Sequence, residues 1–272
     1  MSKKFYIIIF LIILGFGYYS RYISTRGLIV KEYAYSNKKI PSEFIGKKIV
    51  HFSDLHFSKS INEKELILLV KTINEIKPDI CVFTGDLIDK YYTISAAEKE
   101  LLIKHLGNIK TELGKYAIKG NHDYENSFFE EIMNKSNFKL LKNSNDLIYY
   151  KGNEPIFIAG TPSMLKDKVK IESTFKDQKE YFTIYLAHEP DVLKKVRGEE
   201  IDLMLSGHSH GGQVRFPFVG ALYSPVGSKL YYEEHYKKDE TDLYISSGIG
   251  TSSIRVRFLN KPSINLYRLD NK

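Results

Sequence analysis

Five short segments of the chain carry side chains that commonly bind metal ions, and each follows an apolar, β-rich run. They read Asp54-Leu55-His56, Gly85-Asp86-Leu87-Ile88-Asp89, Gly120-Asn121-His122-Asp123, Ala187-His188-Glu189-Pro190 and Gly207-His208-Ser209-His210. Together they offer imidazoles, carboxylates and one amide carbonyl, a mixed nitrogen and oxygen set that suits manganese, iron or zinc. The sequence therefore predicts a metal-dependent hydrolase.

The apolar runs that precede these segments are predicted to be short buried strands. They cover residues 49–53, 80–84, 116–119, 182–187 and 201–206. Open α/β sheets build their ligand sites at the carboxyl ends of strands. We therefore expect the five segments to converge at one edge of a sheet.

Phosphoryl chemistry explains why such residue types would be needed together. Two cations about 3.5–4 Å apart can clamp the attacking and leaving oxygens of an in-line displacement, and a water held between them loses its proton near neutral pH. Such a pair needs one bridging carboxylate. We expect Asp86 to be the bridge, because Gly85 before it permits close backbone approach and because it lies between the other segments in chain order.

In this order, the motifs Asp-x-His, Gly-Asp-x-x-Asp, Gly-Asn-His-Asp, a single His and Gly-His-x-His resemble the calcineurin-like metallophosphoesterase superfamily, from about residue 49 to the C-terminus. The segments 207–213 and 247–252, with Arg257-Phe258 after them, are similar to its branch of bacterial enzymes tethered by an N-terminal membrane segment. Protein serine/threonine phosphatases of the superfamily carry Arg-Gly after the second motif. Lys90-Tyr91 stands there in this chain, which weakens a phosphoprotein-phosphatase interpretation.

The resemblance implies a centre of two divalent metal ions, with Mn²⁺ expected and Zn²⁺ or Fe as alternatives. The implied ligands are Asp54, His56 and His210 for one ion, Asn121, His188 and His208 for the other, and Asp86 for both. His122 is left to bind the phosphoryl oxygen and to protonate the leaving alkoxide, with Asp89 as the partner that fixes its tautomer and orientation. Asp123 is expected to orient the backbone or support a ligand rather than to touch metal.

The remaining histidines considered are expected to be structural or solvated. His51 lies inside a predicted strand, His105 lies on a predicted helix, and His235 lies in a charged loop. Taken singly, the metal motifs are weak, since Gly-Asn-His-Asp can be a turn and Asp-x-His is common by chance. Their ordered combination is what favours a functional site over a structural one.

The N-terminus predicts a membrane anchor. Residues 5–19 are uncharged and largely apolar, and this run is long for the core of a signal peptide but short of the ~20 residues that span a bilayer comfortably. No Ala-x-Ala-like cleavage site follows, so residues 1–26 are expected to form an uncleaved single-pass transmembrane helix and residues 27–272 the catalytic domain. The flanking charges barely discriminate orientation. The tethered branch places its catalytic domain outside the cytoplasm, and we expect the same here.

The pattern of elements predicts one α/β domain. Helical periodicity covers residues 63–77, 95–107 and 128–135, between the strands of the first half. An edge strand is expected at 28–36, and further strands at 147–150, 155–160, 242–246 and 263–269. We expect a two-sheet α/β sandwich of the metallophosphoesterase type, flanked by helices, with the metals at one edge of the sheets. The single cysteine, Cys81, lies in a predicted strand, so disulfides contribute nothing.

Charge and composition bear on the substrate. The net charge of +7 favours anionic surroundings, and without a recognisable nucleic-acid module we expect membrane or envelope phosphates rather than nucleic acid. Residues 214–236 are dense in aromatic side chains, and they are interpreted either as a lid that faces lipid or substrate or as packing over the sheet edge. Arg215, near the last motif, could meet a substrate phosphate.

The expected activity is hydrolysis of a phosphodiester or pyrophosphate bond in an envelope or lipid-linked substrate, by attack of a metal-bound hydroxide. Three alternatives stay open. They are a broad-specificity phosphomonoesterase on the same site, a non-catalytic metal-binding scaffold, and a cytoplasmic nuclease with the opposite topology.

Overall fold

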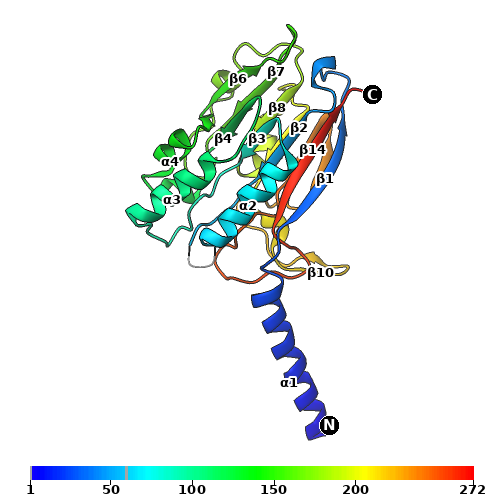
Figure 1. Cartoon of the computed structure of the whole chain (residues 1–272). Helices are drawn as coiled ribbons and strands as arrows, with labels where there is room; N and C mark the ends of the chain where they lie inside the picture. The colour runs from blue at the N-terminus through cyan, green and yellow to red at the C-terminus, as the bar shows by residue number, and fades with distance from the viewer. Residues whose placement is uncertain (1, 59–60) are drawn as a thin grey trace.

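The computed structural model describes residues 2–58 and 61–272, in which two six-stranded sheets pack face to face and helix α1 extends away from them (Figure 1). The α-helices are α1 (Lys3–Tyr18), α2 (Glu63–Ile76), α3 (Ala96–Gly107), α4 (Phe129–Lys135) and α5 (Ile171–Thr174). The strands of the first sheet are β1 (Ile29–Ser36), β2 (Lys48–Phe52), β3 (Ile80–Phe83), β4 (Gly114–Ala117), β5 (Lys139–Leu140) and β14 (Ser263–Asp270). Those of the second are β6 (Ser144–Ile148), β7 (Ile156–Gly160), β8 (Thr183–Leu186), β9 (Leu203–Ser206), β12 (His235–Lys238) and β13 (Thr241–Ile245).

The strand order brings the carboxyl ends of the central strands together. In the first sheet the order is β1-β14-β2-β3-β4-β5, and β2 to β5 run parallel to one another. In the second the order is β12-β13-β9-β8-β7-β6, and β7, β8, β9 and β13 are parallel. A separate hairpin pairs β10 (Arg215–Phe216) with β11 (Gly220–Ala221). The two-sheet α/β fold expected from the sequence is confirmed, with β1 at an edge of its sheet.

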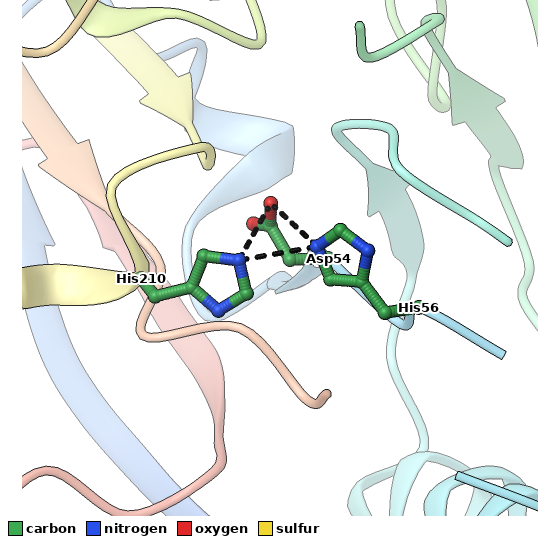
Figure 2. A group of neighbouring side chains, drawn as sticks. All are labelled: Asp54, His56 and His210. Carbon is green, nitrogen blue, oxygen red and sulfur yellow. Dashed lines mark hydrogen bonds and ion pairs between the residues drawn. The ribbon is translucent and has the colours of Figure 1, made fainter. Parts of the chain in front are cut away.

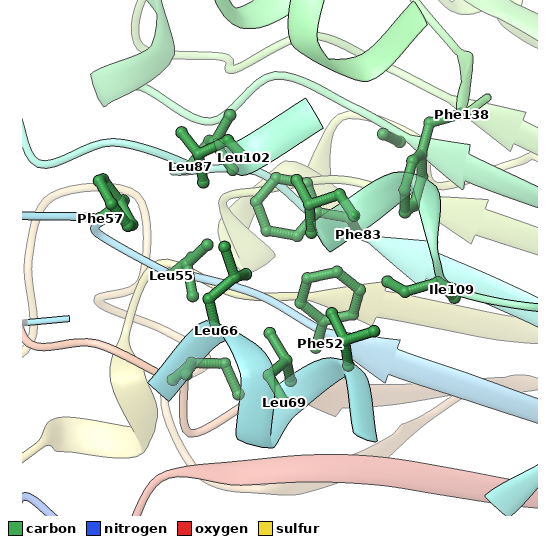
Figure 3. Packing of buried hydrophobic residues seen from close by; sticks show 14 of the residues in the cluster. Phe52, Leu55, Phe57, Leu66, Leu69, Phe83, Leu87, Leu102, Ile109 and Phe138 are labelled. Carbon is green, nitrogen blue, oxygen red and sulfur yellow. The ribbon is translucent and has the colours of Figure 1, made fainter. Parts of the chain in front are cut away.

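The central strands are apolar on both faces because both faces are covered. Val50, Phe52 and Phe83 pack with α2 and α3 on the outer face of the first sheet, as Figure 3 shows for two of them. Their neighbours Ile49 and Val82 point to the other side and join the core between the two sheets. Strands buried on both faces read as continuous hydrophobic runs, which is why these strands were predictable from sequence.

Helices α2 and α3 begin where the sequence predicts them to begin. Asn62 caps α2 and Ser95 caps α3, each in a capping box with the glutamate three residues later. Helix α2 ends at Ile76, and Lys77 adopts a left-handed conformation before Pro78. Both helices cover the outer face of the first sheet, so they hold β2 and β3 in place behind the metal motifs (Figure 1).

Some predicted elements differ from the observed ones. Strand β4 starts at Gly114 and ends at Ala117, two residues earlier than expected, and β6 covers Ser144–Ile148 rather than residues 147–150. His235 does not lie in a loop, because it begins β12, where it pairs with Tyr244 of β13. Polar edge strands such as β6 and β12 lack the apolar run by which a buried strand is recognised.

The N-terminal helix is longer than its uncharged core. Helix α1 continues as a π-helix over Tyr19–Ile23, and the combined 21 residues, Lys3–Ile23, are long and apolar enough to cross a membrane by length and composition. The apolar side chains of α1 are exposed. Ser20, Ser24 and Thr25, by contrast, are buried, so the chain joins the domain at the end of this helix.

Candidate metal centre

A first group of potential ligands forms after β2 and β9. Asp54, His56 and His210 point toward one another, and the Nε2 atoms of the two histidines are 3.1 Å apart (Figure 2). Asp54 Oδ1 lies 3.9 Å from Nε2 of His56 and 3.5 Å from Nε2 of His210. All three side chains are buried.

A second group forms beside it, after β3, β4, β8 and β9. His188 Nε2 lies 3.3 Å from Asp86 Oδ2, 3.2 Å from His208 Nδ1 and 3.1 Å from Asn121 Oδ1. Asp86 Oδ2 is also 3.7 Å from Nε2 of His56, which belongs to the first group. The Asp86 carboxylate therefore lies between the two groups.

The backbone that presents these side chains is in a conformation that residues other than glycine rarely adopt. Five of the predicted ligands have positive φ: Asp54 (51°), His56 (45°), Asp86 (59°), His208 (66°) and His210 (51°). Such residues cost of the order of 1–3 kcal/mol each, and they persist where the surrounding structure holds them, commonly at functional sites. A purely structural turn would not need so many of them together.

Two glycines let the second and third motif loops come into contact. Gly85 has a φ of 96°, and a Cβ there would be 2.2 Å from the backbone nitrogen of Gly120. A Cβ on Gly120 would in turn lie 2.2 Å from Asp86 Oδ1. Asp123 joins the same loops, since its carboxylate accepts hydrogen bonds from the backbone N–H groups of Asp86, Leu87 and Gly120, each at 2.8 Å. Asp123 thus orients the backbone, as predicted.

Hydrogen bonds to carbonyl oxygens define which nitrogen of two histidines faces the site. His188 Nδ1 lies 2.7 Å from the carbonyl oxygen of Thr84, and His208 Nε2 lies 2.8 Å from that of Val226. A carbonyl only accepts, so each of these nitrogens carries a hydrogen and donates it. In the neutral rings, Nε2 of His188 and Nδ1 of His208 are then free to bind a metal, and such supporting bonds are typical of metal-ligating histidines.

The protonation states suit cation binding. Burial lowers the pKa of His56 to about 3 and that of His208 to about 4, so both rings are neutral at physiological pH. Burial works to raise the pKa of Asp86, but the charge and hydrogen bond of His188, with His122 and His56, hold that pKa well below its usual range. Burial works to lower the pKa of His188, and Asp86 raises it well above the usual value. The Asp86 carboxylate and the His188 imidazolium thus stabilise each other's charged forms.

His122 lies close to Asp86 of the second motif, but the carboxylate of Asp89, its expected partner, is directed elsewhere. Nε2 of His122 lies 4.0 Å from Asp86 Oδ2, and its backbone N–H donates to Asp86 Oδ1 at 2.8 Å. Asp89 does not contact it: the Asp89 carboxylate accepts from the backbone of Tyr91 in the turn after β3. Within the described residues, His122 Nδ1 has no hydrogen-bond partner. The expected Asp89–His122 pair is therefore corrected, because the turn at Asp89 directs its carboxylate back onto its own chain.

Arg257 supports the first group and was not singled out from the sequence beyond its place in the tail motif. It is fully buried, and its guanidinium donates to the carbonyl oxygens of Ser247, Gly248 and Gly250. The backbone N–H of Gly250 donates in turn to the carbonyl oxygen of Asp54 at 2.7 Å. Arg257 thus fixes the tail behind Asp54. Two glycines some residues before an arginine are a weak signal, because the sequence does not reveal burial.

His51 has the structural role expected of it and gives a pH prediction. It is fully buried in β2, its Nε2 lies 2.8 Å from Thr84 Oγ1, and burial lowers its pKa from 6.5 to about 3. Below pH 6.5 the unfolded chain binds a proton at His51 that the folded chain does not, so stability is lost as the pH falls toward 3. One such group contributes a slope of about 1.4 kcal/mol per pH unit.

Urea unfolding of the wild type and of His51→Gln, measured between pH 6.5 and pH 4.5, should therefore give different slopes, with the variant less sensitive to acid. Only the slopes are compared, because the variant also changes the hydrogen bond to Thr84 and hence the stability at neutral pH. Parallel pH profiles for the two proteins would contradict the account of His51.

A pocket of about 410 Å³ opens onto the second group. Its polar wall includes Asp86, Asn121, His122 and His208. The apolar residues that line it are Val214, Leu222, Tyr223, Pro225, Ile254 and Val256. Arg215 is not among the lining residues, because it pairs with Glu233 and donates to the carbonyl oxygen of Gly211. The expectation that Arg215 meets a substrate phosphate is not supported by this arrangement.

Comparison with known proteins agrees with the motifs. The family model of the calcineurin-like phosphoesterases matches residues 47–212. The uncharacterized metallophosphoesterase YkuE of Bacillus subtilis is 34% identical over 259 residues, which are 94% of this chain and 90% of that protein. A "transmembrane protein with metallophosphoesterase domain" of Danio rerio is 29% identical over 247 residues, 84% of this chain and 54% of that protein. The solved structure of the protein TT1561 of Thermus thermophilus aligns with a TM-score of 0.48 at 12% identity, over 75% of this chain and 90% of that chain.

The matched residues 47–212 include every predicted metal ligand and exceed half of the chain. The relative from Bacillus subtilis extends the similarity over nearly the whole length. The chain therefore belongs to the calcineurin-like phosphoesterase family.

Proposed function

We propose that this chain is a membrane-anchored phosphoesterase that hydrolyses a phosphodiester or pyrophosphate bond with the help of two divalent metal ions. The position of Asp86 carries the proposal. Its Oδ2 atom lies within 3.7 Å of a histidine nitrogen of each ligand group, so one carboxylate can serve both ions. Membership of the phosphoesterase family supports the reaction class.

The donor atoms fit two ions of the manganese, zinc or iron type. Asp54, His56 and His210 offer one carboxylate oxygen and two imidazole nitrogens within 4.8 Å of one another, and Asp86, His188 and His208 offer the same set. Asn121 adds an amide oxygen to the second group. Nitrogen and oxygen donors without sulfur favour these metals, and Mn²⁺ is our first choice. When bound, the ions would supply the positive charge that activates water and neutralises the phosphoryl oxygens.

The chain's own groups would handle the proton at the leaving group. His122 lies on the pocket wall next to Asp86, and its side chain is partly exposed to the pocket. An imidazolium there can donate a hydrogen bond to a phosphoryl oxygen and a proton to the departing alkoxide. We retain His122 in this role. Asp89 does not act as the partner of His122, because its carboxylate accepts a hydrogen bond from the backbone N–H of Tyr91.

The charge of the pocket favours a diester or a pyrophosphate over a monoester. Among the described residues that line it, none is lysine or arginine. A phosphomonoester carries more negative charge at its terminal phosphate than a diester and is commonly held by arginine. The metal ions would be the main positive charge in this site, which suits the less highly charged diester group.

The N-terminal helix supports a location at the membrane. Residues Lys3–Ile23 are long and apolar enough to span a bilayer, and the relative from Danio rerio is named a transmembrane protein. We propose that residues 1–26 form a single-pass anchor, that residues 27–272 form the catalytic domain, and that this domain lies outside the cytoplasm. A site held at that surface would meet phosphoesters of the envelope, which are the proposed substrate class.

Matched substrates test the proposed reaction. The full-length chain, loaded with Mn²⁺, should hydrolyse bis(4-nitrophenyl) phosphate faster than 4-nitrophenyl phosphate, because no lysine or arginine among the described residues lines the pocket to hold the second charge of the monoester. The two substrates share a leaving group, so the ratio of kcat/KM reports the preference for the ester. A monoester preference would support the phosphomonoesterase alternative. Two bound metals without hydrolysis of either substrate would support the scaffold alternative.

A further inference from the structure

Apolar side chains on the segments that line the pocket, and on residues next to them in the chain, are exposed to solvent. We call them the apolar rim: Phe218, Val219, Leu222, Tyr223, Val226 and Ile254, all of which are exposed. Phe218 is the extreme case, since it is fully exposed and adopts a φ of 66° between β10 and β11. A large apolar residue in a left-handed conformation at a hairpin tip gains nothing from packing within the chain. Contiguous exposed apolar groups of this kind mark an interaction surface.

The hairpin of the apolar rim lies at the end of the molecule from which α1 leaves the domain (Figure 1). Phe16 of α1 stacks on Phe216 of β10, with ring centroids 6.0 Å apart, and meets Phe258 at 4.8 Å. The backbone N–H of Arg257 also donates to the carbonyl oxygen of Ser20 at 3.0 Å. The last turns of the N-terminal helix are thus held against the hairpin and the tail.

The length of the helix fixes the depth of this contact. At 1.5 Å per residue, the helix rises only about 20 Å from Lys3 to Phe16, whereas the hydrocarbon core of a bilayer is about 30 Å thick. A helix that spans the bilayer must therefore continue past Phe16, and the segment Lys3–Ile23 is long and apolar enough to do so. Phe16 therefore lies inside the apolar layer or at its boundary, and Phe216, which stacks on it, must lie at a similar depth.

Positive charge is placed where anionic headgroups would meet it. Arg21 and Arg26 follow the apolar part of the helix, and Arg255 is adjacent to Ile254 of the apolar rim. Burial lowers the pKa of Arg255, and the charges of Arg21 and Arg26 lower it further while that of Glu65 raises it, so both arginines lie near enough to act on Arg255. Basic residues beside exposed aromatic and aliphatic residues are typical of surfaces that rest on anionic membranes.

We propose that the apolar rim docks into the bilayer that holds α1, and that the metal pocket receives its phosphoester from that bilayer. This inference rests on the proposed function for the reaction and names the substrate class as a membrane lipid whose phosphate enters the pocket while its hydrocarbon chain stays in the membrane. Leu222, Tyr223 and Ile254 belong both to the apolar rim and to the pocket wall. They give the pocket that holds Asp86 and His208 an apolar wall that is exposed at the apolar rim.

The aromatic stretch 214–236 thus has two roles. Tyr231 is buried and packs on Tyr236, with ring centroids 5.1 Å apart, as the packing interpretation expects. Phe218 and Tyr223 are exposed, as the interpretation of a lipid-facing lid expects. The bilayer, rather than the protein, would cover the second set.

Tryptophan fluorescence tests docking without any assay of activity. The chain contains no tryptophan, so Phe218→Trp introduces a single reporter at the hairpin tip. Tyr149→Trp is the matched control, because Tyr149 is exposed in the turn between β6 and β7, at the end of the sheet opposite to the metal loops. The full-length variants would be reconstituted in vesicles of phosphatidylglycerol and phosphatidylcholine with brominated acyl chains.

We expect the brominated lipid to quench Phe218→Trp and to leave Tyr149→Trp as bright as in unbrominated vesicles. Equal emission of Phe218→Trp in both kinds of vesicle would overturn the docking proposal. Shielding of Phe218→Trp from both the lipid quencher and aqueous acrylamide would assign the apolar rim to a protein partner, such as a second copy of the chain, and would also overturn it.

A second measurement tests the substrate class. Dodecyl 4-nitrophenyl phosphate partitions into vesicles, whereas methyl 4-nitrophenyl phosphate stays in water, and both release the same leaving group. Replacing Phe218 and Val219, which do not line the pocket, by serine should lower the dodecyl-to-methyl rate ratio roughly tenfold, a change worth about 1.4 kcal/mol of lost apolar contact. An unchanged ratio would contradict supply from the bilayer. If the wild type hydrolysed neither ester while brominated lipid still quenched Phe218→Trp, the proposed function would be rejected and the docking proposal would remain supported.

Discussion

Asp86→Ala should lose metal from both ligand groups and nearly all hydrolysis. Asp86 Oδ2 is the oxygen that lies near histidine nitrogens of both groups, and Asp86 Oδ1 also accepts the backbone N–H of His122. Losing several kcal/mol of charge stabilisation corresponds to a drop in kcat/KM of roughly 10²–10⁴. Elemental analysis of the purified variant, beside steady-state kinetics, measures both effects.

Asp202→Ala is the matched control for Asp86→Ala. Asp202 is also a buried carboxylate, but it precedes β9 at the end opposite to the metal loops, where it accepts from the backbone N–H of Thr183. Its loss should lower stability and leave the metal content unchanged. Two metals per chain and near-normal turnover in Asp86→Ala would show that Asp86 is not a shared ligand.

His122→Asn should separate chemistry from metal binding. We expect the variant to keep both ions and the fold, and to lower kcat by roughly 10²–10⁴, the usual range for a positioned acid or base. The defect should be smaller for a nitrophenyl ester than for an alkyl ester, because nitrophenolate departs without needing a proton. The two substrates are compared on the same preparations with the metal content measured beforehand.

His105→Asn is the control for His122→Asn. His105 lies on α3, pairs with Glu63 and does not line the pocket. It should turn over both esters at the wild-type rate. Equal losses on both esters in His122→Asn would mean that His122 stabilises phosphoryl charge rather than donating a proton. Loss of one metal would make it a ligand, a role that its distance of 4.0 Å from Asp86 Oδ2 leaves sterically open.

The sequence predicts the central strands and the convergence of the motifs because both depend on strong local signals. Strand β3 is apolar throughout and β2 is apolar at Ile49, Val50 and Phe52, and parallel strands of one sheet must end on the same side. Residues that follow their carboxyl ends are therefore brought together wherever the strands are correctly identified. The ordered motifs then identify the family, which the comparisons confirm.

Other features of the site depend on contacts between distant residues and could not be predicted. Asp89 and His122 are close in motif order, yet the turn after β3 directs Asp89 to Tyr91. Arg257 supports Asp54 through the backbone of the tail, a relation that no spacing in the sequence indicates. The exposure of Phe218 is equally hidden, because the sequence alone does not distinguish an aromatic residue that packs in the core from one that is exposed.

Electron paramagnetic resonance of the full-length chain during titration with Mn²⁺ tests the central claim most directly. A carboxylate shared by two ions about 3.5–4 Å apart couples their spins. We predict saturation at two Mn²⁺ per chain and the spectrum of an exchange-coupled pair, which Asp86→Ala should abolish. Saturation at one Mn²⁺ per chain, with the six-line spectrum of an isolated ion, would contradict a centre in which Asp86 bridges two metals.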